Sequence, residues 1–207
     1  AVETLIKKYN IGEIYHLVSL LSVGGEAQPD LCWKINMDGL KNILDLARAY
    51  SLKVFWPSSI AAFGPTTPVD NTPQRTILEP TTIYGVTKVA GELLCQYYFL
   101  KYGLDVRSVR YPGIITWKTP PGDGTSEYST AMFYEGLQKG SYTCFLREDT
   151  MIPMMYIADA VKATLMIMDA PAKSIKIRTS YNIAALSFSA KELEDEIERI
   201  PGVARVV

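Results

Sequence analysis

A serine pair and a tyrosine–lysine pair are the residues of this sequence best suited to chemistry. Ser58 and Ser59 end an apolar segment, and Tyr84 and Lys88 follow at a spacing of four in a helical pattern. Residues i and i+4 share one helical face, so the Lys88 ammonium can lie beside the Tyr84 phenol. A phenol with a pKa of about 10 becomes a base at neutral pH only when a cation stabilises its anion, and a shift to about 7 takes roughly 4 kcal/mol. With Ser59 holding a substrate oxygen, these groups predict a site that takes the hydroxyl proton from an alcohol losing hydride.

The Tyr-x-x-x-Lys spacing has low specificity by itself. The chain contains 13 Tyr, and such a pair arises about once by chance in a chain of this composition. Tyr97 and Lys101 repeat the spacing further along the same segment. Because no serine-bearing strand end leads to this second pair, we assign it to packing or to the surface.

Alternating strand and helix patterns surround the predicted site. The periodicity predicts strands at 12–18, 53–57 and 105–111, and helices at 30–50 and 82–102. Strands separated by helices of this length indicate βαβ crossovers, and hence an α/β fold with a doubly wound parallel sheet. Ligands bind such sheets at the carboxyl ends of the strands, where Ser59 would lie.

The regular alternation of strand and helix patterns ends at Tyr111. We expect a loop at 117–127, helices near 128–139, 156–169 and 189–199, and short strands near 142–146 and 180–183. Residues 116–150 and 186–207 are interpreted as a smaller part, and 1–115 as the main sheet domain, to which 151–185 partly return.

Composition excludes several classes of function. The chain has 207 residues and a formal net charge of −1, which gives no reason to expect nucleic acid or an anionic membrane as a partner. No apolar stretch approaches the roughly 18 residues of a membrane span. A single histidine, His16, argues against a metal site and against a Ser-His-Asp hydrolase. Three cysteines without a CxxC pair predict buried, reduced thiols.

The strand-end serine and the Tyr-x-x-x-Lys pair resemble the signature of the extended short-chain dehydrogenases/reductases. Within that superfamily the chain is similar to the short-chain L-threonine 3-dehydrogenases over most of its length. The matching segments are HLVSLLS (16–22), FWPSSIAAFGPTTP (55–68), YGVTKVAGELLCQYY (84–98), VRYPGII (109–115), KTPPGDGT (118–125), PMMYIADAVKAT (153–164) and KIRTSYNIAALSFS (176–189).

This resemblance implies a Rossmann-type domain in 1–115, a substrate-binding smaller part, and NAD-dependent oxidation of the 3-hydroxyl of L-threonine to 2-amino-3-ketobutyrate. Tyr84 would be the base, Ser59 would position the hydroxyl, and Lys88 would tune Tyr84 and hold the nicotinamide ribose. The implied cofactor contacts are Leu17, Asn36, Ser58, Tyr84, Lys88, Tyr111, Pro112, Gly113 and Ile114. The implied substrate contacts are Ser22, Ser59, Tyr84, Gly124 and Thr125.

Some of these residues also have simpler interpretations. Ser22 and Thr125 suit the capping of a turn or loop, and Asn36 suits a hydrogen bond to a backbone carbonyl within its helix. The resemblance further implies a homodimer through helices 30–50 and 82–102, although the apolar residues there suit packing within one chain as well.

The family's Gly-x-x-Gly-x-x-Gly turn and the acidic residue that reads the adenine ribose are not found in this sequence. We therefore expect the first βαβ unit and the end of the substrate domain to lie outside this chain. The choice of NAD over NADP then follows from the resemblance alone. The expected compartment is the cytoplasm, or the mitochondrial matrix in a eukaryote.

Two other functions stay open. One is a nucleotide-sugar 4-epimerase or dehydratase of the same superfamily. Those relatives usually carry Phe-Asn after the Arg-Tyr of the strand, where this chain has Pro112 and Gly113. The other is a truncated, non-catalytic paralogue that acts as a binding module.

Overall fold

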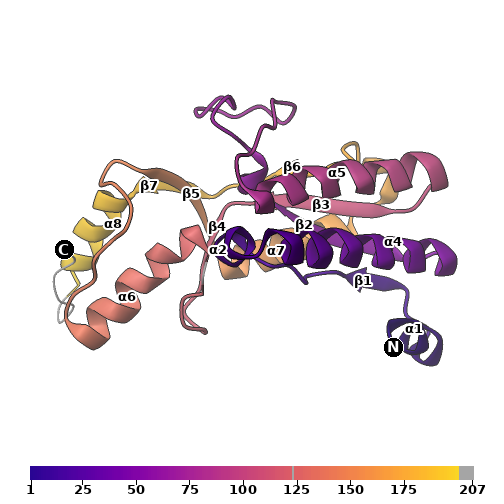
Figure 1. The fold of residues 1–207 in the computed structure, drawn as a ribbon, viewed down its shortest axis with the longest axis horizontal. Coiled ribbons are helices and arrows are strands. Elements are labelled where there is room, and N and C mark those ends of the chain that lie inside the picture. Colours follow the sequence, from indigo (N-terminus) through magenta and orange to yellow (C-terminus); the bar gives the residue numbers. More distant parts are fainter. Residues whose placement is uncertain (123, 201–207) are drawn as a thin grey trace. The chain divides into compact units, whose positions relative to one another are not determined.

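The computed structural model describes residues 1–122 and 124–200, and this part of the chain divides into two compact units. The first unit comprises Ala1–Tyr111 and Lys162–Ile183, and the second comprises Pro112–Val161 and the chain from Ala184 onward. The elements, labelled in Figure 1, are α1 (Val2–Tyr9), β1 (Glu13–Tyr15), α2 (Ser22–Ala27), α3 (Pro29–Trp33), η1 (Lys34–Asp38), α4 (Gly39–Tyr50), β2 (Lys53–Ser59), η2 (Ile60–Ala62), α5 (Ile83–Tyr102), β3 (Val106–Tyr111), β4 (Gly113–Ile115), η3 (Thr125–Glu127), α6 (Tyr128–Lys139), β5 (Met151–Tyr156), α7 (Ile157–Asp169), η4 (Ala172–Ser174), β6 (Tyr181–Asn182), β7 (Leu186–Ser189) and α8 (Ala190–Glu198).

The sheet of the first unit is parallel, which confirms the predicted α/β class. Its strand order over the described residues is β1–β2–β3–β6, and every neighbouring pair runs in the same direction. In the central pair, Ser58 lies opposite Arg110 and Ser59 lies opposite Tyr111. The carboxyl ends of β1, β2 and β3 therefore share one edge of the sheet.

Both faces of this sheet are covered, as the continuous apolar runs of its strands require. On β2, Val54 and Trp56 pack in one core with residues of α4 and α5. The intervening Phe55 belongs to the core on the opposite face, together with Met168 of α7. This alternation is the period of two expected when successive side chains point to opposite faces. Figure 1 shows α4 and α5 running along the sheet.

The predicted helix at 30–50 is present, with a change of winding in its middle. It is formed by α3, the π-helical segment η1 and α4 in direct succession. A π-helical turn inserts extra backbone into a helix and frequently occurs at functional sites. Asn36 lies in this turn and is buried.

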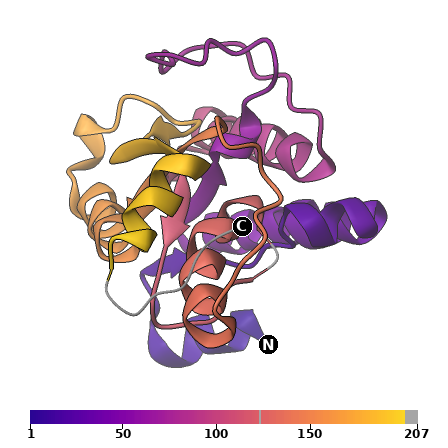
Figure 2. The same ribbon diagram turned by 90° about the vertical axis from the view of Figure 1, so that its left-hand side faces the viewer.

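The second unit has a small mixed sheet. β4 pairs with β5 in parallel, and β5 pairs with β7 in antiparallel fashion. Tyr128 and Met132 of α6 and Ile197 of α8 form its core with Met154 of β5. Figure 2 shows the helices of this unit, α6 and α8, in the foreground, with α8 in yellow.

The predicted strand at 142–146 is wrong. Tyr142, Cys144 and Leu146 do alternate toward the core of the second unit, which explains the pattern. Within the described residues the segment forms only an isolated bridge at Tyr142 and does not extend into a strand. Strand β5, which lies in the apolar run before α7, was not predicted from the sequence.

Within the described ranges 1–122 and 124–200, none of the helices combines the length and apolarity needed to span a lipid bilayer. The three cysteines, Cys32, Cys95 and Cys144, are free thiols.

Candidate active site

Tyr84 and Lys88 come from the first two turns of α5. The side chain of Thr82 accepts a hydrogen bond from the Gly85 amide and caps this helix, which fixes where its first turn begins. The Lys88 ammonium lies 5.1 Å from the centre of the Tyr84 ring and 4.8 Å from the Trp56 ring. It donates a hydrogen bond of 2.8 Å to the carbonyl of Pro57. The lysine is therefore held between its own helix and strand β2.

The backbone beside Tyr84 is closely packed. A Cβ atom on Gly85 would lie 2.3 Å from the carbonyl oxygen of Ala61 and 2.5 Å from Cβ of Pro80. These two residues lie at the two ends of the long loop after η2, so only glycine allows this loop to close against the start of α5. The close approach fixes the position of the tyrosine that precedes Gly85.

Ser59 lies at the carboxyl end of β2 and faces Tyr84. Its hydroxyl oxygen accepts a hydrogen bond of 3.1 Å from the amide of Ala61, which caps η2. Its side chain also hydrogen-bonds with the Tyr84 phenol. The structure thus brings together Ser59, Tyr84 and Lys88 at the carboxyl edge of the sheet.

Burial dominates the electrostatics of this cluster. Burial raises the pKa of Tyr84 to about 12, and the hydrogen bond with Ser59 acts in the opposite direction with a smaller effect. Burial also lowers the pKa of Lys88 to about 8. The spacing of Tyr84 and Lys88 in the sequence predicted that the ammonium lowers the pKa of the phenol. In the folded chain the loss of water around both groups outweighs that attraction, because a buried site disfavours each charged form.

Asn36 joins three segments around the site. Its side-chain oxygen accepts from the amide of Leu20 at 2.8 Å, and its side-chain nitrogen donates to the carbonyl of Leu20 at 3.1 Å. The same nitrogen donates to the Thr87 hydroxyl at 3.1 Å, and that hydroxyl donates to the carbonyl of Tyr84 at 2.7 Å. Asn36 therefore ties the segment after β1 to the first turn of α5.

The segment after β1 contains two more predicted contact residues. Leu17 is 64% exposed and follows His16, whose amide donates to the carbonyl of Phe55 at 2.9 Å. Ser22 is the first residue of α2 and is partly buried. The Nε2 atom of His16 is buried, and none of the described residues forms a hydrogen bond with it. Burial and the nearby Lys88 charge lower the pKa of this imidazole, which favours its neutral form.

Ser58 and Tyr111 lie at the same edge but turn their side chains elsewhere. The Ser58 hydroxyl is buried and donates to Glu92 at 2.5 Å. The Tyr111 hydroxyl hydrogen-bonds with Thr164 of α7. The contact of each residue with a cofactor stays a prediction. Because both hydroxyl groups already have partners, backbone or ring atoms would make this contact.

The remaining predicted residues belong to the second unit. Pro112 and Gly113 are buried and Ile114 is partly buried, the last two in β4. Gly124 precedes η3 and its carbonyl accepts from the amide of Glu127 at 2.9 Å, while Thr125 is exposed at the start of η3.

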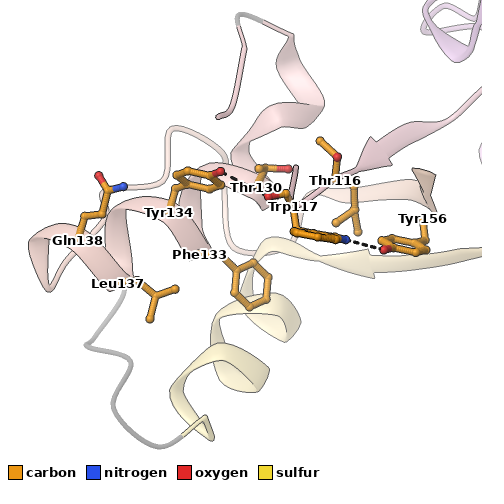
Figure 3. A pocket seen from close by; sticks show the side chains of 9 residues that line it. Thr116, Trp117, Thr130, Phe133, Tyr134, Leu137, Gln138 and Tyr156 are labelled. Atoms are coloured by element: carbon orange, nitrogen blue, oxygen red, sulfur yellow. Dashed lines mark hydrogen bonds between the residues drawn. The ribbon is translucent and has the colours of Figure 1, made fainter. Parts of the chain in front are cut away.

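The second unit also contains a pocket that was not predicted from the sequence. Its volume is about 520 Å³, and it is lined by Ile115, Thr116, Trp117, Thr130, Phe133, Tyr134, Leu137, Gln138 and Tyr156. Figure 3 shows the Trp117 indole between β4 and α6, donating a hydrogen bond of 2.9 Å to the Tyr156 hydroxyl. The spacing of Phe133, Tyr134, Leu137 and Gln138 on one face of α6 is the sequence signal that could have indicated it. Over residues 1–122 and 124–200, no group of three or more His, Cys, Asp or Glu side chains is placed to hold a metal ion.

The chain is similar in sequence to curated proteins and similar in both sequence and fold to solved structures. An uncharacterized epimerase/dehydratase of Staphylococcus haemolyticus is 45% identical over 205 residues, which cover 99% of this chain and 64% of that protein. The chain thus spans a little under two thirds of the length of this curated relative. The holo form of a GalE-like L-threonine dehydrogenase from Cupriavidus necator superposes with a TM-score of 0.95 at 49% identity, covering 100% of this chain and 68% of that one.

An L-threonine dehydrogenase from Clostridium difficile gives a TM-score of 0.94 at 45% identity, over 100% of this chain and 65% of that one. Residues 1–184 match the family described as the NAD dependent epimerase/dehydratase family. Because this match covers most of the chain and includes the Ser59, Tyr84 and Lys88 cluster, the chain belongs to the NAD dependent epimerase/dehydratase family.

Proposed function

We propose that this chain carries the proton-transfer centre of an NAD-dependent dehydrogenase that oxidises the 3-hydroxyl of L-threonine to 2-amino-3-ketobutyrate. The observation that carries the proposal is the meeting of Ser59, Tyr84 and Lys88 at the carboxyl edge of a parallel sheet. The likeness to L-threonine dehydrogenases supports the choice of substrate.

The groups around Lys88 fit the nicotinamide-ribose end of NAD. An ammonium has three N–H donors, and the carbonyl of Pro57 accepts one of them. The others are available to ribose hydroxyls beside Tyr84. Asn36 and the backbone near Leu17 lie after β1 at the same edge of the sheet, where they would support the cofactor. NAD supplies the acceptor for the hydride of the substrate when it is bound.

The proton of the substrate hydroxyl goes to the oxygen of Tyr84 once this phenol has lost its own proton to solvent. The Ser59 hydroxyl, already hydrogen-bonded with this phenol, would orient the substrate oxygen toward it. Because the folded chain holds the pKa of Tyr84 at about 12, the phenol is protonated at neutral pH until more positive charge reaches it. The Lys88 ammonium is already beside the ring, so this additional charge would come from the nicotinamide ring of bound NAD. Both cations attract a phenolate strongly where water is excluded. The substrate contacts implied at Ser22, Gly124 and Thr125 stay predictions from the sequence.

A nucleotide-sugar epimerase or dehydratase is the second candidate, since curated relatives carry that description. One feature of the second unit argues against it. A Cβ atom at Gly113 would lie 2.1 Å from the sulfur of Met154 and 2.8 Å from Cβ of Ser126. The asparagine that such epimerases usually carry at this position would require both Met154 and Ser126 to shift.

We also propose that the protein forms a homodimer through the helices at 30–50 and 82–102. Val86, Leu93, Tyr97 and Leu100 of α5 are all exposed. Their spacing of seven, four and three residues places them on one face of the helix. An exposed apolar stripe of this kind is typical of an interaction surface.

The experiment that tests the proposed function offers substrates to the full-length protein in the presence of NAD. We expect NADH to form with L-threonine and not with L-2-aminobutyrate, which has the same backbone but no 3-hydroxyl. UDP-glucose and UDP-galactose are tested in parallel by chromatography of the products. Interconversion of these sugars without NADH formation from L-threonine would establish the second candidate instead. NAD binding without turnover of any of these substrates would contradict both.

A further inference from the structure

Three side chains of α5 contact the end of β2 in regular steps. Tyr84 hydrogen-bonds with Ser59, and Lys88 donates to the carbonyl of Pro57 at 2.8 Å. Glu92, one turn further along the same helical face, accepts a hydrogen bond of 2.5 Å from the Ser58 hydroxyl. Residues 57, 58 and 59 of the strand are thus each held by one residue of the helix.

Glu92 is held in turn by Arg110 of β3. The carboxylate is 1% exposed and accepts two hydrogen bonds from the guanidinium, at 2.8 Å from Nε and 2.6 Å from Nη2. Arg110 lies directly opposite Ser58 in the sheet. The pair is bidentate, and this geometry fixes the direction of both groups as well as their distance.

The remaining donor of Arg110 reaches the long loop between η2 and α5. Its Nη1 atom donates to the side-chain oxygen of Asn182 at 2.9 Å and to the carbonyl of Gln74 at 3.4 Å. The Gln74 side chain donates to the carbonyl of Ser180 at 2.7 Å and accepts from the amide of Asn182 at 2.8 Å. The two ends of this loop close around Gly85, next to Tyr84.

Stability alone gives a weak reason for such a pair. Buried ion pairs are often no more stabilising than apolar residues of similar volume, because both charges lose their water. The pair instead fixes the orientation of the Glu92 carboxylate relative to Ser58. With Arg110 fixing the carboxylate, the Ser58 hydroxyl has one partner, and the peptide that carries Ser59 is held in one orientation toward the helix.

We propose that Glu92 is a positioning residue of the active site: held by Arg110, it acts through Ser58 to fix the end of β2 so that the Ser59 hydroxyl meets Tyr84. This inference rests on the proposed function, because it assigns Ser59 and Tyr84 to the reacting hydroxyl. Neither Glu92 nor Arg110 touches the reacting atoms in this assignment.

The test uses Glu92→Gln, Ser58→Ala and the double variant in the full-length protein. Ser58→Ala leaves the ion pair intact, so it reports on positioning even where Glu92→Gln folds poorly. We expect each single variant to lower kcat for L-threonine by at least about 10-fold with a smaller change in KM, since small misplacements of reacting groups are costly. If Glu92 acts through Ser58, the double variant is no slower than the slower single variant.

Asp105→Asn is the matched control. Asp105 precedes the opposite end of β3, and its carboxylate accepts hydrogen bonds from Arg107 at 2.7 Å and from Arg178 at 2.6 Å. We expect this variant to lower the melting temperature. Its kcat should stay within about twofold of the wild-type value, because Asp105 is remote from the site and shares no partner with Glu92 or Ser58. Equal losses of kcat in Asp105→Asn and in the Ser58 and Glu92 variants would assign Glu92 to stability alone and overturn the proposal.

Crystal structures of the Ser58 and Glu92 variants give a readout that needs no activity. We expect the Ser59 hydroxyl to move away from the Tyr84 phenol by more than about 0.5 Å, the tolerance of a catalytic arrangement. An unmoved Ser59 would overturn the positioning role whatever the substrate. A wild-type protein inactive toward L-threonine, combined with a displaced Ser59 in the variants, would instead overturn the proposed substrate and support the positioning role.

Discussion

The Lys88 ammonium lies 5.1 Å from the centre of the Tyr84 ring, and only 3% of the Lys88 surface is exposed. The cation that the proposed mechanism needs is thus placed where its own charge is disfavoured. Burial lowers the pKa of Lys88 and raises the pKa of Tyr84, so the fold holds both groups nearer to their neutral forms than water would. Strained electrostatics of this kind are typical of functional sites.

Replacing Tyr84 by Phe should remove the acceptor of the hydroxyl proton. We expect kcat for L-threonine oxidation to fall about 10²- to 10⁴-fold, the usual contribution of a positioned base. Tyr97→Phe is the matched control, because it sits in the second Tyr-x-x-x-Lys pair of the same helix and is 50% exposed. Steady-state rates of both variants decide the assignment, and turnover retained in Tyr84→Phe would contradict it.

Replacing Lys88 by Met should stabilise the protein when no cofactor is added. Its folded pKa of about 8 lies below the ordinary value of 10.5. The folded state therefore binds this proton more weakly than the unfolded state, which costs about 3 kcal/mol at pH 7. Methionine keeps most of the apolar stem without the charge.

The pH dependence gives the sign of this effect. Between pH 8 and pH 10.5 the unfolded chain holds the Lys88 proton while the folded chain releases it. The free energy of unfolding of the wild-type protein therefore rises with pH relative to that of the Lys88→Met variant. Urea unfolding at pH 7 and above pH 10 should show the Lys88→Met advantage shrinking. An advantage that stays constant with pH would show that burial of the charge is not its cause.

Gly85→Ala should disturb the start of α5. The new Cβ atom would lie 2.3 Å from the carbonyl oxygen of Ala61, and that backbone cannot move without shifting η2. We expect a loss of about 1–3 kcal/mol in the free energy of unfolding and a lower kcat, because Tyr84 is the preceding residue. Gly12→Ala is the control, because no atom of the described residues lies within 4 Å of the added carbon. It should change the free energy of unfolding by no more than about 0.5 kcal/mol.

Asn36→Ala should release the segment that follows β1. The substitution removes the hydrogen bonds to the amide and carbonyl of Leu20, so that amide should exchange hydrogen with solvent faster. We expect a destabilisation of about 1–3 kcal/mol from the buried groups left unpaired. Asn42→Ala in the exposed part of α4 is the control. Unchanged exchange at Leu20 would contradict the role given to Asn36.

A glutamate at Leu93 should dissociate the proposed dimer. Leu93 is 57% exposed on α5, so the change adds a charge to the apolar stripe without touching the core. We expect analytical ultracentrifugation to show a monomer, with the melting temperature measured alongside. Leu165→Glu, at a 49% exposed position of α7, should leave the oligomeric state unchanged. A wild-type protein that sediments as a monomer would rule out the interface.

The sequence by itself determined the parts of this protein that depend on short-range spacing. Short apolar runs alternating with period-3.6 patterns indicated the parallel sheet and its helices, since a strand of such a sheet buries both faces and a covering helix buries one. The meeting of Tyr84 and Lys88 followed from a spacing of four in a helix. The place of Ser59 followed from its position at the end of a strand.

Tertiary structure alone decided which distant segments pair and which groups lose their water. The apolar pattern at 142–146 is the same for a strand as for an extended core segment. Only the folded structure, in which Tyr142, Cys144 and Leu146 pack in the core of the second unit and the described residues there form no strand, chose the second. Glu92 meets Ser58 and Arg110 across separations of 34 and 18 residues, which no local pattern specifies. The pKa of Tyr84 depends on how completely its surroundings exclude solvent, and that exclusion is a property of the packed fold rather than of the order of the residues.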